Sequence, residues 1–250
     1  MKIKVLKNSE ELGQEAAAFC ADVLRKTIAE KGSARIILST GASQFDILKA
    51  LVKQDINWSK VEMFHLDEYI NMPKTHPASF RKYLEERFVN LVNLKKAYYV
   101  NGEGNLEENI RVLTEEVRKA PIDLALIGIG ENAHIAFNDP PADFDTKEAY
   151  IVVNLDEKCR NQQFGEGWFP AIEDVPKQAM SMTVYQMMQS SVIVSFVPYK
   201  VKADAVRNTL ENVLTNLIPA TMLKKHHNWV LFLDEDSASL ADKSILNKYA

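Results

Sequence analysis

The sequence predicts an α/β protein with a doubly wound, mostly parallel sheet and helices on both faces, in the Rossmann-like manner. Short apolar runs rich in β-branched residues recur along the chain, as buried strands do. Longer segments with apolar residues three and four positions apart lie between them, as in amphipathic helices. Because strands that alternate with helices pair in parallel through right-handed crossovers, we expect one sheet that is covered on both sides.

The individual elements follow from these two patterns. Continuous apolar runs predict strands at residues 35–38, 61–65, 122–127, 151–153, 191–197 and 229–233. Apolar stripes at helical spacing predict helices at residues 10–31, 43–53, 77–88, 106–118 and 202–214. The chain shows no internal repeat and no Gly/Ser-rich linker, so we expect a single domain over residues 1–250. Residues 139–175 have weak periodicity and several prolines and glycines, which predicts a mobile, lid-like insertion at about 140–178.

The bulk composition excludes several classes of protein. A net charge of -4 on 250 residues gives no cationic field for a nucleic acid or an anionic membrane. The N-terminus lacks the features of a signal peptide, and no run approaches the roughly 20 apolar residues of a membrane span, so we expect a soluble, cytoplasmic protein. Cys20 and Cys159 are far apart and lack metal-ligand spacing, which favours ordinary reduced thiols.

The first candidate functional site is the turn Ser39-Thr40-Gly41-Ala42-Ser43, where an expected strand leads into an expected helix. Backbone N–H groups at such a turn, with the Ser43 hydroxyl, would form an anion site for a phosphate. The alternative is that Ser43 only caps the helix and Gly41 only makes the turn. The segment matches neither the P-loop nor the dinucleotide-binding motif, so no nucleotide cofactor is indicated.

A second candidate is the pair Asp67 and Glu68 after the strand at residues 61–65. A carboxyl group that is partly desolvated at a strand end has a raised pKa and can serve as a general base. The alternative is that both residues only cap a turn or pair with surface lysines. His76, in front of Pro77 at an expected helix start, is interpreted as structural.

The third candidate follows the strand at residues 122–127. The chain breaks at Gly128 and Gly130 and then presents His134, flanked by Asn132 and Asp139. Neighbours of this kind can orient an imidazole and tune its pKa for proton transfer, although a buried core histidine is the alternative. A metal centre would need further ligands at suitable spacing, and His226 and His227 adjoin each other on a basic stretch, so no metal is expected.

Taken in order, these segments resemble the glucosamine-6-phosphate deaminase (isomerase) family, which is related to 6-phosphogluconolactonase. The resemblance covers most of the chain, and the segment around Gly128, Gly130 and His134 is its most specific part. It continues through 175–182 and ends at 202–207. It implies an enzyme of amino sugar and carbohydrate metabolism, a hydrolase and isomerase that converts glucosamine 6-phosphate and water into fructose 6-phosphate and ammonia without a cofactor.

The resemblance also implies a role for each matching residue. Asp67 would be the general base that moves a proton between C2 and C1, and His134 would open the sugar ring with Asn132 and Asp139 as its companions. The substrate phosphate would be held by a larger set: Ser43, the backbone of Thr40, Gly41 and Ala42, and Lys202. Partners other than a small sugar phosphate are not expected, and self-association into a homo-oligomer is left open.

Several positions depart from the family pattern. The family commonly has Asp or Asn at position 132, Gly where Ala133 stands and Glu where Asp139 stands. A phosphate-binding Arg expected just before Trp168 is absent, and Arg160 is the nearest candidate to replace it. Because only Arg supplies a bidentate fork to phosphate, the exact sugar is the least determined part of the prediction.

Two rival functions remain at this stage. A 6-phosphogluconolactonase has a similar fold and phosphate turn, but Asp67-Glu68-Tyr69 and Phe137-Asn138-Asp139-Pro140 follow the deaminase pattern. A non-catalytic sugar-phosphate sensor would use the same fold, but the presence of both Asp67 and His134 favours an enzyme.

Overall fold

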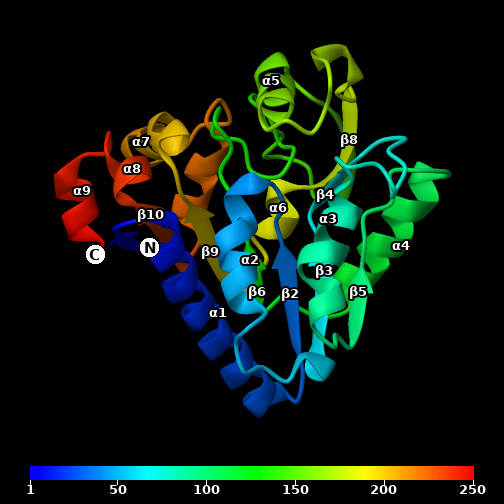
Figure 1. Ribbon diagram of the computed structural model, residues 1–250, viewed down its shortest axis with the longest axis horizontal. Helices are drawn as coiled ribbons and strands as arrows, with labels where there is room; N and C mark the ends of the chain where they lie inside the picture. The colour runs from blue at the N-terminus through cyan, green and yellow to red at the C-terminus, as the bar shows by residue number, and fades with distance from the viewer.

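The computed structural model describes residues 1–250 and contains a seven-stranded sheet in which every neighbouring pair is parallel. The strand order is β1-β10-β9-β6-β2-β3-β5 (Figure 1). The strands are β1 (Lys2–Leu6), β2 (Ala34–Leu38), β3 (Val61–His65), β5 (Lys96–Tyr98), β6 (Leu124–Leu126), β9 (Val192–Val197) and β10 (Trp229–Asp234). The prediction of a doubly wound parallel sheet is confirmed.

The order of the strands fixes where a ligand site can form. From β2 the chain moves outward to β3 and β5, then returns to β6 on the other side of β2 and continues to β9 and β10. The winding therefore reverses between β2 and β6. Open α/β sheets bind ligands in the crevice at the carboxyl ends of the strands at such a point.

Helices cover both faces of the sheet (Figure 1). Those of one face pack over an apolar core that includes Leu24, Leu48 and Leu84: α1 (Ser9–Lys31), α2 (Phe45–Leu51) and α3 (Phe80–Arg87). Those of the other face pack over a core that includes Val117 and Val206: α4 (Leu106–Arg118), α6 (Val184–Met187), α7 (Ala203–Glu211) and α8 (Glu235–Ala238). The chain ends in α9 (Lys243–Lys248). The short 3-10 helices are η1 (Ala42–Gln44), η2 (Trp58–Lys60), η3 (Val89–Leu91), η4 (Ile172–Asp174), η5 (Lys200–Lys202) and η6 (Pro219–Lys225).

The longest helix has clear boundaries in the sequence. The side chain of Asn8 accepts a hydrogen bond from the backbone N–H of Glu11 and so caps the N-terminus of α1. Gly32 ends the helix with φ 80°, the left-handed conformation that glycine adopts without steric cost. The prediction of a helix at residues 10–31 is accordingly correct within one residue.

A second, smaller sheet lies beyond the carboxyl ends of the main strands. It is antiparallel, in the order β4 (Asp67–Tyr69), β8 (Gln178–Met182) and β7 (Tyr150–Asn154), and α5 (Glu157–Gly165) sits beside it at the top of Figure 1. The strand expected at residues 151–153 exists as β7, but its placement in the parallel sheet was wrong. Burial alternates along β7, as in an antiparallel strand with one wet face.

The segment expected to be an irregular insertion therefore contains regular structure. Residues 140–178 include β7, α5 and η4. The helix α5 escaped detection because it has no apolar stripe: only Cys159 and Gln163 are buried in it. The three-residue strands β4 and β5 are too short to show a pattern, and β1 alternates lysines with apolar residues.

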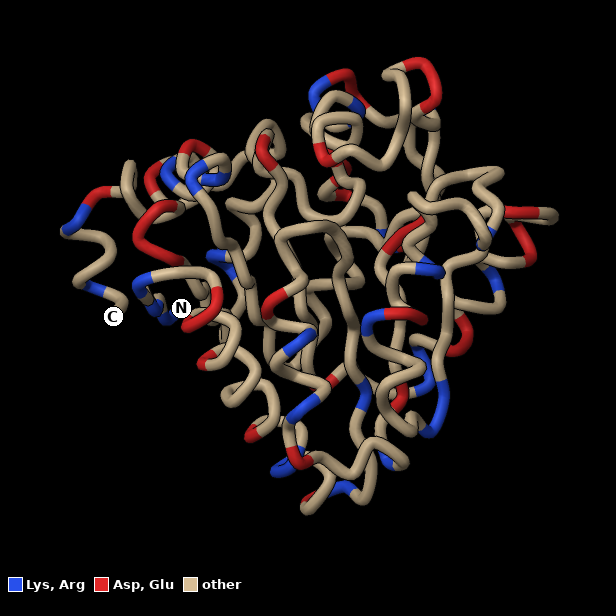
Figure 2. Tube along the Cα trace, viewed as in Figure 1, with Lys and Arg blue, Asp and Glu red and all other residues tan.

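The surface is consistent with the composition. Figure 2 shows basic and acidic residues interspersed along the chain. No helix has the length and apolar character needed to cross a bilayer.

Candidate active site

A cleft opens at the carboxyl ends of four neighbouring strands, β9, β6, β2 and β3. Nine of its lining residues belong to the turn at Gly41 or are the candidate residues and glycine breaks that the sequence singled out: Ser39, Thr40, Gly41, Ser43, Asp67, Gly128, Gly130, His134 and Lys202. The others are Leu66, Phe80, Ile129, Ala136, Phe137, Gln162, Gln163 and Glu166. The candidate base, imidazole, phosphate turn and lysine thus share one hollow.

Asp67 lies at the start of β4, two residues beyond the end of β3, and is 6% exposed. Burial, reinforced by the neighbouring carboxylate of Glu68, raises the pKa of Asp67 to about 8, against a smaller opposing effect of the Phe137 backbone. A carboxyl group with this pKa takes up a proton near neutral pH and is suited to general base catalysis. The geometry thus favours the catalytic interpretation of Asp67.

Glu68 has a different role. Its carboxylate accepts hydrogen bonds from the Ser79 hydroxyl, at 2.8 Å, and from the backbone N–H groups of Phe80 and Arg81 at the start of α3. The guanidinium of Arg81 lies 3.3 Å away and completes a buried ion pair. Glu68 therefore anchors the start of α3, which is close to the capping alternative, whereas Asp67 lines the cleft.

His134 lies in the loop after β6, and Gly130 before it makes room for its ring. A Cβ at position 130 would overlap the imidazole of His134, so only glycine fits there. The loop also passes through Ala133 with φ 64°. This left-handed conformation explains why a glycine is common at position 133 in the family pattern. The buried ring faces the cleft, which favours a functional histidine over a core one.

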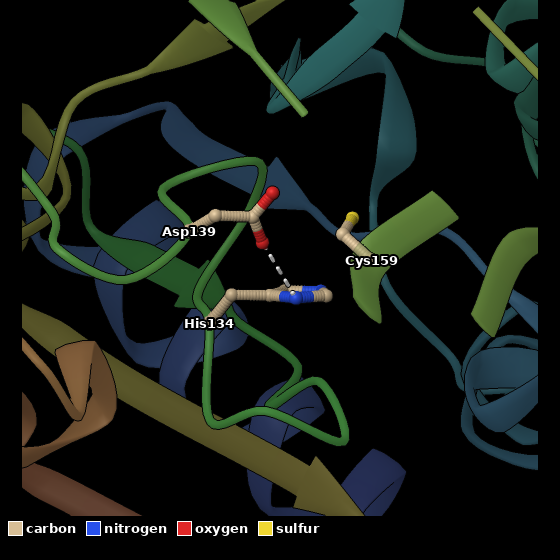
Figure 3. Close-up of side chains that lie close together, drawn as sticks. All are labelled: His134, Asp139 and Cys159. Carbon is tan, nitrogen blue, oxygen red and sulfur yellow. Dashed lines mark ion pairs between the residues drawn. The ribbon is translucent and has the colours of Figure 1, made fainter. Parts of the chain in front are cut away.

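Two companions position the imidazole of His134. Its Nδ1 lies 3.1 Å from Oδ1 of Asp139 (Figure 3). The angles at this contact do not meet those of a hydrogen bond, so the interaction is chiefly electrostatic. The Asn132 side chain accepts from the backbone N–H of His134 and donates to Asp139 at 3.2 Å. Burial opposes ionisation of Asp139, but His134 and these donors outweigh it and lower the pKa of Asp139. We conclude that the pair is held ready to stabilise a protonated imidazole.

The expected reduced thiol of Cys159 lies beside this pair, a placement that the sequence did not predict. One ligand atom from each of His134, Asp139 and Cys159 falls within 4.8 Å of the others (Figure 3). These are the only residues of the chain grouped so that they could hold a metal ion. Burial and the nearby carboxylates raise the pKa of the Cys159 thiol well above its ordinary value, so the thiol stays protonated. A protonated thiol is a poor metal ligand.

The phosphate turn is rigidly held. Gly41 has φ 101°, and its carbonyl accepts a hydrogen bond from the Tyr83 hydroxyl at 2.9 Å. The amide of Gln44 donates to Ser43 Oγ and to the Phe196 carbonyl, both at 3.1 Å. Ser43 lies within η1 and caps no helix, because the caps are Gly41 for η1 and Gln44 for α2. The helix expected to open at Ser43 therefore opens as a 3-10 turn, and the N-cap alternative for Ser43 is wrong.

Lys202 reaches the cleft from η5, after β9, and is 5% exposed. Burial lowers the pKa of its amine, and the carboxylates of Glu131 and Glu166 counteract this. Arg160 does not line the cleft; its Nη2 donates to the Ile172 carbonyl at 2.7 Å. This geometry does not support the expectation that Arg160 replaces the missing phosphate-binding arginine.

Sequence reasoning missed the side chains that cover the cleft. Gln162, Gln163 and Glu166 reach it from α5 and the residue after it. The altered segment around the missing arginine pointed to this region. No pattern in the sequence indicated that a helix there carries polar side chains to the cleft.

The chain is similar to known proteins over nearly its whole length. Residues 7–232 match the family of glucosamine-6-phosphate isomerases and 6-phosphogluconolactonases. A glucosamine-6-phosphate deaminase of Thermoanaerobacter sp. (strain X514) is 36% identical over 248 residues, covering 96% of this chain and 95% of the relative. One from Streptococcus uberis is 35% identical, covering 97% of this chain and 100% of the relative.

Solved structures show the same fold. The structure of a monomeric glucosamine-6-phosphate deaminase superposes with a TM-score of 0.87 at 30% identity, covering 96% of this chain and 100% of the other. A 6-phosphogluconolactonase from Shewanella baltica superposes with a TM-score of 0.77 at 18% identity, covering 94% of this chain and 97% of the other. The second likeness extends to the fold alone.

Proposed function

The chain belongs to the family of glucosamine-6-phosphate isomerases and 6-phosphogluconolactonases, and we propose that it is a deaminase that converts glucosamine 6-phosphate and water into fructose 6-phosphate and ammonia. The observation that carries the proposal is the cleft shared by Asp67 and His134, the first with a raised pKa and the second paired with Asp139. Both positions match the family pattern, in a chain similar to deaminases over nearly its whole length.

The reaction begins with ring opening. His134 carries the proton from the anomeric hydroxyl to the ring oxygen, and the C1–O5 bond breaks to give the open aldehyde. Asp139 stabilises the imidazolium that forms on the way, because its carboxylate lies 3.1 Å from Nδ1. Asn132 fixes the orientation of both partners. Groups held in this way typically contribute about 10²- to 10⁴-fold to a rate.

Asp67 then acts on the open chain. Its carboxylate removes the proton from C2 while O1 takes up a proton, which gives an enol-amine. It then returns the first proton to C1 while the amine nitrogen loses one, which gives a ketose imine. Water adds to C2 of the imine, and ammonia leaves as the C2 carbonyl forms. Each of these steps is a proton transfer, an addition or an elimination, so acid and base groups are the catalysts that the reaction requires.

The phosphate lies at the far end of the cleft in this proposal. It accepts hydrogen bonds from Ser43 and from the backbone of Thr40, Gly41 and Ala42, with the ammonium of Lys202 as the opposite charge. Residues 140–178 act as a lid over the substrate, since α5 contributes Gln162 and Gln163 to the cleft. We further propose that residues 1–250 work as one catalytic unit, since the cleft draws on segments from Ser39 to Lys202.

The test is a direct assay. Purified protein is incubated with glucosamine 6-phosphate in the presence of a metal chelator, and ammonia and fructose 6-phosphate are measured. We expect both products in equal amounts. Consumption of 6-phosphogluconolactone, with neither product formed from the amino sugar, would instead assign the lactonase reaction to this cleft.

A further inference from the structure

A carboxylate occupies part of the proposed phosphate position. Glu166, directly after α5, lies with Oε2 3.4 Å from the backbone nitrogen of Ala42, whose N–H points at it. The same carboxylate accepts from the indole Nε1 of Trp168 at 3.2 Å and from Nε2 of Gln162 at 3.0 Å. One of the N–H groups assigned to the substrate phosphate is thus already in contact with an anion of the protein.

The charges at this end of the cleft are unfavourable for phosphate. Lys202 is the only lysine or arginine that lines the cleft, and Glu166 lies near enough to raise the pKa of its amine against the effect of burial. A phosphate dianion bound at the turn would meet one ammonium and, if Glu166 stayed in place, one carboxylate. Two negative charges that share one binding turn, here the carboxylate and the phosphate, repel each other appreciably even in a partly hydrated site.

Nothing ties Glu166 firmly to this position. It forms no ion pair with a lysine or arginine, and the three donors to its carboxylate are neutral. Its side chain is half-buried, at the end of a helix on the segment that covers the cleft. The carboxylate can therefore leave at a lower cost than a buried, charge-paired group.

We propose that Glu166 determines specificity: its carboxylate occupies the anion turn of the free protein, and an incoming phosphate must displace it. Glu166 therefore weakens binding of a phosphate dianion and makes the affinity for the distal group depend on its charge. The identity of that group as the substrate phosphate rests on the proposed function. The competition between the carboxylate and an anion at Ala42 does not.

The test uses inorganic phosphate as the probe. Its Kd is measured by isothermal titration calorimetry for the wild-type chain and for Glu166→Gln, which keeps the shape of the side chain and removes its charge. We expect Kd to fall about tenfold, as for the loss of one like charge at the edge of a hydrated site. Glu173→Gln is the matched control, since Glu173 is exposed on the same covering segment, and it should leave Kd unchanged.

Displacement has its own readout. Because Trp168 donates to Glu166, phosphate binding should change the fluorescence of the wild-type chain, and Trp168→Phe should abolish that change. An equal or higher Kd for Glu166→Gln would overturn the inference. So would phosphate binding without a change in Trp168 emission.

Enzyme kinetics separate this inference from the proposed function. In the deaminase assay, Glu166→Gln should lower the KM for glucosamine 6-phosphate about tenfold, with a smaller change in kcat. If the wild-type chain releases no ammonia, the proposed function fails while the phosphate titration still decides the role of Glu166. If ammonia is released and Kd is unaffected by the substitution, the function stands and the competition is refuted.

Discussion

The two ends of the cleft are built differently. At the reacting end, Asp67 and His134 are buried, and Asn132 and Asp139 fix the imidazole with contacts to its ring and backbone. At the anion end, the turn is rigid, but its charge balance depends on one lysine and on Glu166 from the covering segment. In the mechanism that we propose, the sheet and its loops thus supply the acid and base groups, whereas α5 and the residues after it select the distal group.

The strongest test of the reacting end is Asp67→Asn. An amide cannot accept the C2 proton, so we expect kcat to fall by about 10³-fold or more. The same change should stabilise the fold. Burial raises the pKa of Asp67 from its ordinary value of 3.8 to about 8. Between pH 3.8 and pH 8 the unfolded chain therefore loses this proton more readily than the native state, so the native state loses stability as pH rises.

The measurement that separates these effects is thermal unfolding. At pH 8, Asp67→Asn should unfold about 5 °C above the wild-type chain, and the gap should close towards pH 4. Low activity together with a lowered unfolding temperature at pH 8 would indicate structural damage instead of a lost base.

The pH profile tests the same residue without a mutation. Asp67 must be deprotonated to act as a base, so kcat/KM should fall about tenfold for each pH unit below a midpoint near 8, until other groups titrate. Stopped assays of ammonia from pH 5.5 to 9.5 would show this limb. A kcat/KM that stays constant down to pH 5.5 would mean that Asp67 is ionised at neutral pH and would contradict the effect of burial.

At the anion end, Lys202→Met removes the only ammonium in the cleft and keeps most of the volume of the side chain. We expect KM for glucosamine 6-phosphate to rise roughly 10- to 100-fold, as for the loss of a charge-assisted hydrogen bond, with a smaller change in kcat. Lys200→Met is the control, since Lys200 is exposed and donates to Ser239. A collapse of kcat at unchanged KM would place Lys202 in the chemistry and remove the contrast between the two ends.

The smallest effect concerns the loop that carries His134. Ala133 has φ 64°, so Ala133→Gly should relieve backbone strain and stabilise the fold by about 0.5 to 1 kcal/mol. Ala125→Gly in β6 is the opposite control, because a buried strand residue should be destabilised by the same exchange. Urea unfolding of both variants gives the comparison, and a lower free energy of unfolding for Ala133→Gly would count against strain at this position.

Much of the fold could be predicted because buried strands and amphipathic helices leave local patterns. The strand at residues 61–65 and the helix at residues 106–118 match β3 and α4 residue for residue. The small antiparallel sheet could not be predicted, because the pairing of β7 with β8 and of β8 with β4 depends on contacts between distant segments. The strand at residues 151–153 was therefore assigned to the wrong sheet.

The candidate site was predictable to a similar degree. Strand ends and glycine breaks indicated the loop of His134 and the turn at Gly41. The strand-end pattern alone could not choose between Asp67 and Glu68, and only the family resemblance favoured Asp67. The choice depends on which side chain faces the cleft and which meets the start of α3. The position of Glu166 at the cleft could not be predicted either, because α5 has no apolar stripe that would indicate a helix.

The four strands that end at the cleft are consecutive in the sheet but come from distant parts of the chain. A substrate that contacts the loops after β2, β3, β6 and β9 would link these four strands at their carboxyl ends. Amide hydrogens in these central strands would then exchange more slowly with solvent, while those of the edge strands β1 and β5 would gain little. Binding in the cleft would thereby reduce local opening of the four central strands of the sheet.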